Sequence, residues 1–135
     1  MERRALLTLV PLAAGLAAAA ATRPALAAGG GGGGEAKAYT RFPTVTGTII
    51  RPGGRRGVMT VEIGIDVHEE TLRETAAVSA PRLRAAYNEV VAQAARELQP
   101  GHAPDVDRLS HELQRATSRI LGRGATVLLG TVMVV

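Results

Sequence analysis

The chain of 135 residues contains no cysteine and no tryptophan, and only 2% of its residues are aromatic: Tyr39, Phe42 and Tyr87. The lack of cysteine excludes disulfides, thiolate metal sites and a cysteine nucleophile. So few rings leave no series of aromatic platforms on which single-stranded nucleic acid or sugars stack. The fold must therefore be held together by an ordinary apolar core.

Positive charge is present but thinly spread. Sixteen Lys and Arg residues against twelve Asp and Glu residues give a formal net charge of +4, and fifteen of the sixteen basic residues are arginine. Residues 1–27 hold three of these arginines and one glutamate, so the rest of the chain carries only +2. Nucleic-acid binding needs a concentrated basic face, and we therefore expect no nucleic-acid partner.

Residues 1–27 have the pattern of a secretory signal peptide. Arg3 and Arg4 precede an uncharged stretch over residues 5–21, and Ala25 and Ala27 supply the small-x-small end that signal peptidase cleaves. The adjacent arginines, the alanine-rich middle and the basic Arg23 favour twin-arginine translocation over the general secretory route. The alternative is an uncleaved membrane anchor, for which residues 5–21 are at the short limit of a span.

Residues 28–38 form a glycine-rich linker, because Gly29 to Gly34 is an unbroken run of six glycines and each would lose much backbone entropy on ordering. One small domain is then predicted over residues 39–135. Residues 45–50 are strand-like, and the glycines that follow Pro52 predict a tight turn. Residues 59–67 alternate apolar and polar side chains, which predicts a partner strand with one buried face.

Three helices and a last strand are expected after this hairpin. The first helix follows a cap at Asp66, with Leu72, Ala76 and Val78 on its inner side. The second begins at Pro81 and runs to residue 98, and the third spans residues 106–121 with Asp105 as its cap. The apolar residues 125–135 predict a strand buried on both faces. The predicted class is α+β, with the order β-β-α-α-α-β and helices on one face of a small antiparallel or mixed sheet of about three strands.

No catalytic, cofactor or metal site is predicted. His68, His102 and His111 are the only residues that could bind a transition metal, and their spacing matches no helical ligand pair. Glu69 and Glu70 lie where a first helical turn favours negative charge, which explains them without acid–base chemistry.

The one compact basic group is Arg51, Arg55 and Arg56, at the tip of the predicted hairpin. Such a tip is able to contact lipid phosphates or an acidic partner, or is simply a solvated turn. It is the candidate for an anionic contact.

Several stretches together resemble the periplasmic domain of the flagellar basal-body-associated protein FliL family. They are residues 57–67, similar to its second strand, residues 80–91, similar to its proline-started helix, residues 109–122, similar to its last helix, and residues 127–135, similar to its last strand. The resemblance implies a stomatin-like α+β domain that assembles into oligomers around the flagellar stator and modulates motility. It also implies that the protein is not an enzyme.

We therefore expect an exported, non-enzymatic protein that acts through protein–protein contacts in the cell envelope, with stator or basal-body proteins as partners. Homo-oligomers are expected because a three-stranded sheet covered on one face leaves its other face and its edges open. The location is the periplasm, with attachment to the inner membrane if the N-terminal segment is not cleaved. The alternatives are an exported binding or structural module unrelated to motility, and an enzyme whose site the sequence does not reveal.

Overall fold

The computed structural model describes residues 38–135. The predicted signal peptide, with Arg3, Arg4, Ala25 and Ala27, and residues 28–37 of the predicted linker lie outside the described residues. The strands are β1 (Tyr39–Arg41), β2 (Val45–Ile50), β3 (Arg56–Val67) and β4 (Ala125–Val134), and the helices are α2 (Glu70–Glu97) and α3 (Val106–Leu121). A short 3₁₀ turn, η1 (Pro52–Gly54), joins β2 to β3.

The sheet is built around β3, its longest strand. β2 pairs with the first half of β3 and β1 with the second half, both on the same side, while β4 pairs along nearly the whole opposite side. All three pairings are antiparallel. A bulge interrupts the β3–β4 ladder around Glu62, where Gly130 and Thr131 of β4 lie opposite one residue of β3.

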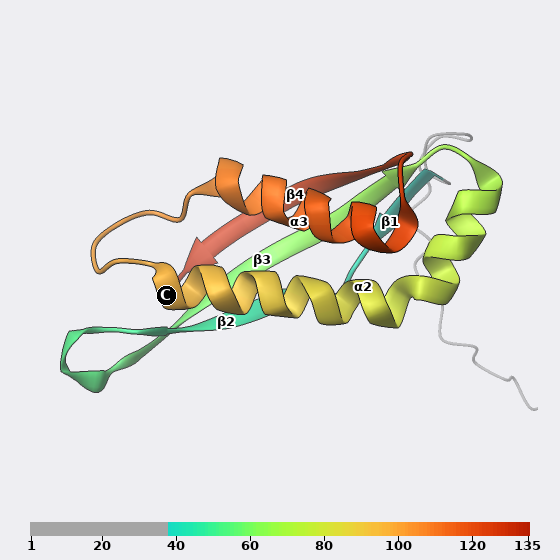
Figure 1. Ribbon diagram of the computed structural model, residues 1–135. Helices are drawn as coiled ribbons and strands as arrows, with labels where there is room; N and C mark the ends of the chain where they lie inside the picture. Colours follow the sequence, from blue (N-terminus) through green and yellow to red (C-terminus); the bar gives the residue numbers. More distant parts are fainter. Residues whose placement is uncertain (1–37) are drawn as a thin grey trace, which may run out of the picture. The chain divides into compact units, whose positions relative to one another are not determined.

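Both helices cover the same face of this sheet (Figure 1). α2 packs mainly on β2, and α3 packs on β4 and beside α2. The predicted alternation in β3 is confirmed, since every second side chain from Met59 to Val67 is buried beneath the helices. The largest fully buried apolar side chains are Met59, Val61, Ile63, Ile65 and Val67 from β3, Leu83, Tyr87 and Val91 from α2, and Leu113 from α3.

The predicted α+β class, the hairpin and the layer of helices on one face are confirmed. The helix over Val106–Leu121 also begins as predicted, because the Asp105 carboxylate accepts a hydrogen bond from the Arg108 backbone N–H at 3.0 Å.

The predicted element order needs two corrections. Residues 39–41 form an additional short strand, β1, and the first two predicted helices are one continuous helix, α2, with Pro81 inside it. Pro81 removes one backbone hydrogen bond, and α2 changes direction along its length (Figure 1). Buried Ala76 and Leu83 lie on either side of the proline, so packing on the sheet maintains the helix across it.

Two finer predictions are wrong. Asp66 does not cap α2, since it is the penultimate residue of β3 and its carboxylate instead lies 3.1 Å from His68 Nε2. The last strand is not buried on both faces: Leu128 and Met133 of β4, opposite Gly64 and Thr60 on the face away from the helices, are exposed. The helices cover only one face, so an apolar run does not by itself guarantee burial.

Candidate functional site

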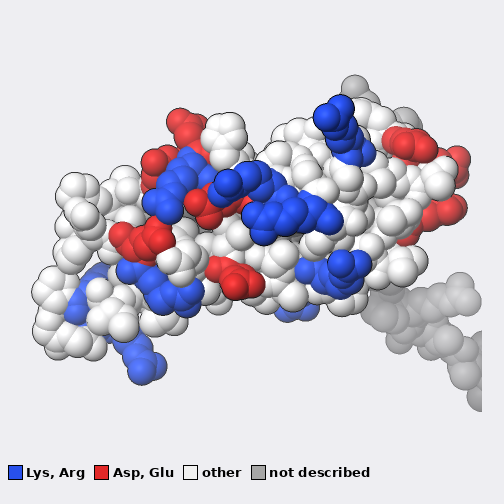
Figure 2. Space-filling view, in the orientation of Figure 1, with Lys and Arg blue, Asp and Glu red and all other residues white. Residues whose placement is uncertain are grey.

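The hairpin tip carries the predicted basic group. Gly53 and Gly54 have φ angles of 82° and 76°, which glycine adopts without strain. The Arg51 N–H donates to the Arg55 carbonyl at 2.7 Å, so Arg51, Arg55 and Arg56 are held close together at the end of the hairpin. Arg55 and Arg56 are exposed, and within residues 38–135 no carboxylate lies within ion-pair distance of any of the three. Basic side chains are visible at the tip in Figure 2.

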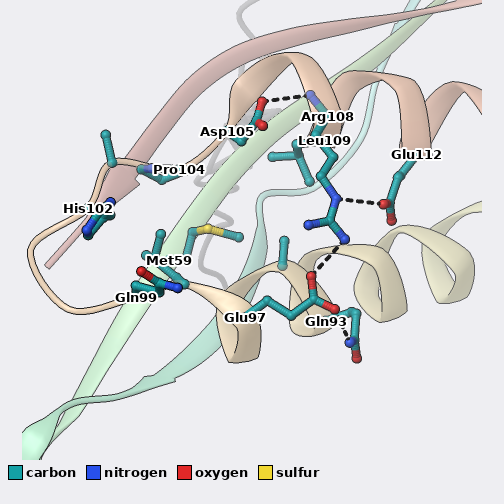
Figure 3. A pocket seen from close by; sticks show the side chains of 13 residues that line it. Met59, Gln93, Glu97, Gln99, His102, Pro104, Asp105, Arg108, Leu109 and Glu112 are labelled. Atoms are coloured by element: carbon teal, nitrogen blue, oxygen red, sulfur yellow. Dashed lines mark hydrogen bonds and ion pairs between the residues drawn. The ribbon is translucent and has the colours of Figure 1, made fainter.

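A groove lies at the same end of the domain, where the C-terminal end of α2 meets the N-terminal end of α3 (Figure 3). Its volume is about 370 Å³. Apolar side chains form its floor: Met59 from β3, Ala94 and Leu98 from α2, and Leu109 from α3. Its rim is polar and includes His102 and Asp105 from the connecting loop.

Arg108 is the central polar residue of this groove. Its Nη2 lies 2.8 Å from the Glu97 carboxylate on α2, and its Nε donates to Glu112 on α3 at 3.2 Å. The guanidinium therefore ties the end of α2 to the start of α3 (Figure 3). With Asp105 included, the groove holds three carboxylates and one guanidinium, which leaves an excess of negative charge.

The pKa shifts of Arg108 and Glu97 agree with this ion pair. The hydrogen bond to Glu112 and the charge of Glu97 raise the pKa of Arg108 above its ordinary value. A hydrogen bond from Gln93, followed by the charge of Arg108, lowers the pKa of Glu97. Both side chains are thus charged at neutral pH, and the charge of Arg96 also acts on Glu97.

A second polar pair is fully buried and serves the packing. The Thr117 hydroxyl donates to the Leu113 carbonyl at 2.9 Å, so the Tyr87 hydroxyl, 2.6 Å away, donates to Thr117. Burial raises the pKa of Tyr87. The Tyr87 ring contacts Phe42 edge-on, with 5.2 Å between the ring centroids. This pair joins α2 to α3 in the core.

The sheet face opposite the helices forms a third candidate site, here called the open face. Val58 pairs with Val135 through two backbone hydrogen bonds, and Met133 lies opposite Thr60 in the next position of the register. Because β3 turns its odd-numbered side chains toward the helices, Val58 points to the open face with Met133 and Val135. All three are exposed, so three apolar side chains lie next to one another without cover from residues 38–135.

The outer edge of β4 is protected over only half of its length. The Gln114 amide group accepts a hydrogen bond from the Val127 N–H at 2.8 Å and donates one to the Ala125 carbonyl at 2.9 Å. This side chain from α3 occupies the hydrogen-bonding positions that another strand would use. Beyond the bulge, β4 has no such side chain bonded to its outer edge among the described residues.

The three histidines do not come together. His68 is exposed beside Asp66, His102 lies at the rim of the groove, and His111 lies on the exposed surface of α3. Among residues 38–135 no three His, Asp or Glu side chains gather closely enough to hold a metal ion. In the same part of the chain, neither helix has the length and apolar character needed to cross a bilayer.

Sequence reasoning placed the arginine tip but missed the groove and the Gln114 side chain that protects the β4 edge. The groove has no linear motif, because its floor comes from β3, α2 and α3 together. One feature of the sequence pointed to the groove. Glu97, Arg108 and Glu112 are charged residues close to a helix–helix connection, where antiparallel helices bring opposite charges together.

Comparison with models of known protein families and with curated protein sequences finds no match for this chain.

Proposed function

We propose that this chain is an exported, non-enzymatic protein that acts through protein–protein contacts in the cell envelope. The observation that carries the proposal is the open face, where Val58, Met133 and Val135 adjoin one another in the sheet and are exposed. Clustered apolar side chains on one surface are typical of a contact site, whereas single exposed ones need no explanation.

The open face has the composition of an interface core with a polar rim. Thr48 and Thr60 lie beside the apolar residues, and the Arg41–Glu62 ion pair, at 2.6 Å, lies further along the same face. Apolar side chains surrounded by polar ones allow a partner to exclude water while the rim remains solvated. Side chains on paired strands of a sheet also lose little backbone entropy on binding.

The proposed partners follow from the resemblance to the FliL family: stator or basal-body proteins of the flagellar motor, with modulation of motility as the role. The proposed location is the periplasm, reached by twin-arginine translocation through residues 1–27. The protein is then either free after cleavage behind Ala27 or attached to the inner membrane. Mass spectrometry of the N-terminus of the protein from envelope fractions distinguishes these two forms.

Co-purification tests the role of the open face. We expect flagellar motor proteins to co-purify with the tagged chain, and the double substitution Val58→Thr and Met133→Thr to abolish this, because threonine keeps the strand preference but removes apolar contact. The matched control is Val78→Thr with Val106→Thr, two exposed valines on α2 and α3. Equal recovery of motor proteins by both variants would contradict a role for this face.

Deletion of the gene tests the flagellar role itself. We expect altered swimming in soft agar, restored by the wild-type chain and not by the Val58→Thr, Met133→Thr variant. Normal swimming of the deletion strain, together with no motor protein in the co-purified fraction, would rule out the flagellar role. That result would favour the alternative, an exported binding or structural module, for which the groove of about 370 Å³ has the size of a ligand site.

A further inference from the structure

The hairpin tip combines charge with apolar surface in a way that a solvated turn does not require. Ile50, the last residue of β2, is 69% exposed and directly precedes Arg51. Arg55 and Arg56 follow on the other side of η1, and no carboxylate among the described residues pairs with them. A partner for this tip therefore needs acidic groups beside an apolar hollow.

The groove between α2 and α3 has that chemistry. Glu97 and Glu112 lie at its polar side, with side chains 40% and 28% exposed. Arg108 uses one oxygen of each; the other oxygen of Glu97 accepts from Gln93, whereas Glu112 keeps its Oε2. Met59, Leu98 and Leu109 supply the apolar floor. A volume of about 370 Å³ is enough for an isoleucine side chain and the stem of an arginine.

A hairpin cannot fill the groove of its own chain. Arg56 and Met59 lie on the same strand, three residues and about 10 Å apart. Backbone pairing from Val45–Val61 to Ile50–Arg56 keeps the hairpin extended, and its tip projects beyond the helices in Figure 1. The occupant of the groove has to come from another molecule, and the complementary tip is present on every copy of this chain.

The geometry points to a two-fold dimer in which the hairpin tip of each copy enters the α2–α3 groove of the other. Tip and groove lie at the same end of the domain, so one two-fold rotation that seats the first tip also seats the second, and the assembly closes at two copies. Ile50 lies over the apolar floor, and Arg55 or Arg56 donates to Glu112 Oε2, with the carboxylate of Glu97 close by. Ile50 and Arg56 point to the same side of the sheet as Val58, so this contact borders the open face. The Arg55→Glu, Arg56→Glu variant leaves Val58 and Met133 unchanged, so the dimer is tested separately from the proposed function.

Cysteine cross-linking of the full-length chain tests the contact, since the chain has no cysteine of its own. Arg55→Cys places a thiol on the tip, and Ala103→Cys places one at the exposed rim of the groove. When the two purified variants are mixed and treated with a short bismaleimide, we expect a covalent dimer that neither variant forms efficiently alone. A mixture of Arg82→Cys, on the exposed surface of α2, with Ala103→Cys is the matched control. Equal yields from both mixtures would overturn the inference.

Sedimentation equilibrium supplies an independent measurement. We expect Arg55→Glu with Arg56→Glu to raise the dimer dissociation constant by about tenfold or more, because it replaces attraction to the groove carboxylates with repulsion. Arg82→Glu with Arg84→Glu makes the same change in net charge at exposed positions of α2 and should leave the constant within about twofold. A wild-type chain that stays monomeric, or a dimer equally stable in both variants, would overturn the inference.

Anionic vesicles separate a protein partner from a lipid surface. The wild-type chain is incubated with phosphatidylglycerol vesicles and with phosphatidylcholine vesicles, and the Arg55→Glu, Arg56→Glu variant is treated in the same way. We expect no binding to either that depends on the tip. Tip-dependent binding to the anionic vesicles, without the tip-to-groove cross-link, would show that the arginines contact lipid and that the dimer does not form.

Discussion

At Gly47 the backbone of β2 comes so close to α2 that no side chain fits between them. A Cβ at this position would lie 2.7 Å from the Ala95 Cβ and 2.8 Å from the Val91 carbonyl oxygen. The second contact is with helix backbone, which cannot rotate away as a flexible side chain could. Gly47 therefore sets the distance between the helix layer and the sheet.

We expect Gly47→Ala to lower the free energy of unfolding by about 1–3 kcal/mol, because α2 must shift from β2 to admit the methyl group. Urea denaturation of the two proteins measures the difference. Thr48→Ala is the control, since Thr48 is exposed on the other face of the same strand and should change stability by only about 0.5 kcal/mol. Equal effects of the two substitutions would contradict the close approach.

The buried pair of Tyr87 and Thr117 gives two substitutions with different expected costs. Thr117→Val leaves the Tyr87 hydroxyl buried without a partner and should cost about 1–3 kcal/mol. Tyr87→Phe should cost about 0.5–1.5 kcal/mol, since Thr117 still donates to the Leu113 carbonyl. Chemical denaturation of both variants measures the order, and a costlier Tyr87→Phe would contradict the assignment of donor and acceptor.

The same tyrosine predicts a dependence of stability on high pH. Burial raises the pKa of Tyr87 in the folded protein above the ordinary value of 10.0. The unfolded chain loses this proton first as the pH rises above that value, so its free energy falls relative to that of the folded protein and stability is lost. We expect the wild-type protein to lose more stability than the Tyr87→Phe variant above pH 10, measured by denaturation at a series of pH values. Parallel curves would contradict the assignment.

At the scale of the elements, Gln114 connects α3 to the edge of β4. We expect Gln114→Ala to release the Val127 amide and to speed its hydrogen exchange by about tenfold, which corresponds to about 1.4 kcal/mol for one lost hydrogen bond. Hydrogen exchange measured by NMR reports this residue directly. Arg115→Ala, at the exposed position next along α3, is the control and should leave the Val127 exchange rate unchanged.

The sequence pattern predicted an element correctly where a few neighbouring residues decide its structure. The period-two alternation of β3 and the Asp105 cap of α3 are both decided within a few residues, and both are confirmed. The prediction of a helix break at Pro81 was wrong. The proline costs one helical hydrogen bond, but the burial of Ala76 and Leu83 on the sheet offsets this cost, and the sequence alone does not show that burial. The groove could not be predicted for a related reason: three separate elements build it.

At the scale of the molecule, the tip and the N-terminal entry to the sheet lie at opposite ends of β3. β1 pairs with residues 64–66 of β3, and the hairpin turns at Arg56, so the two are separated by about ten residues of strand, or roughly 33 Å. The arginine tip therefore lies away from β1, the first strand of the described residues.

The fold is closed by the last strand, because β4 pairs with residues about seventy positions earlier in the chain. The two halves of β4 differ in support: α3 and Gln114 hold the first half, while the second half ends in the Val58–Val135 pair beside the open face. We expect a chain that stops after Val132 to fold, with a loss of about 2–6 kcal/mol, because the Val58–Val135 and Thr60–Met133 pairs each lose two backbone hydrogen bonds. A chain that stops after Thr126 loses the cover of buried Ile63 and Ile65 and should not fold. Circular dichroism with thermal melting compares the two truncations, and equal melting curves would contradict this division of β4.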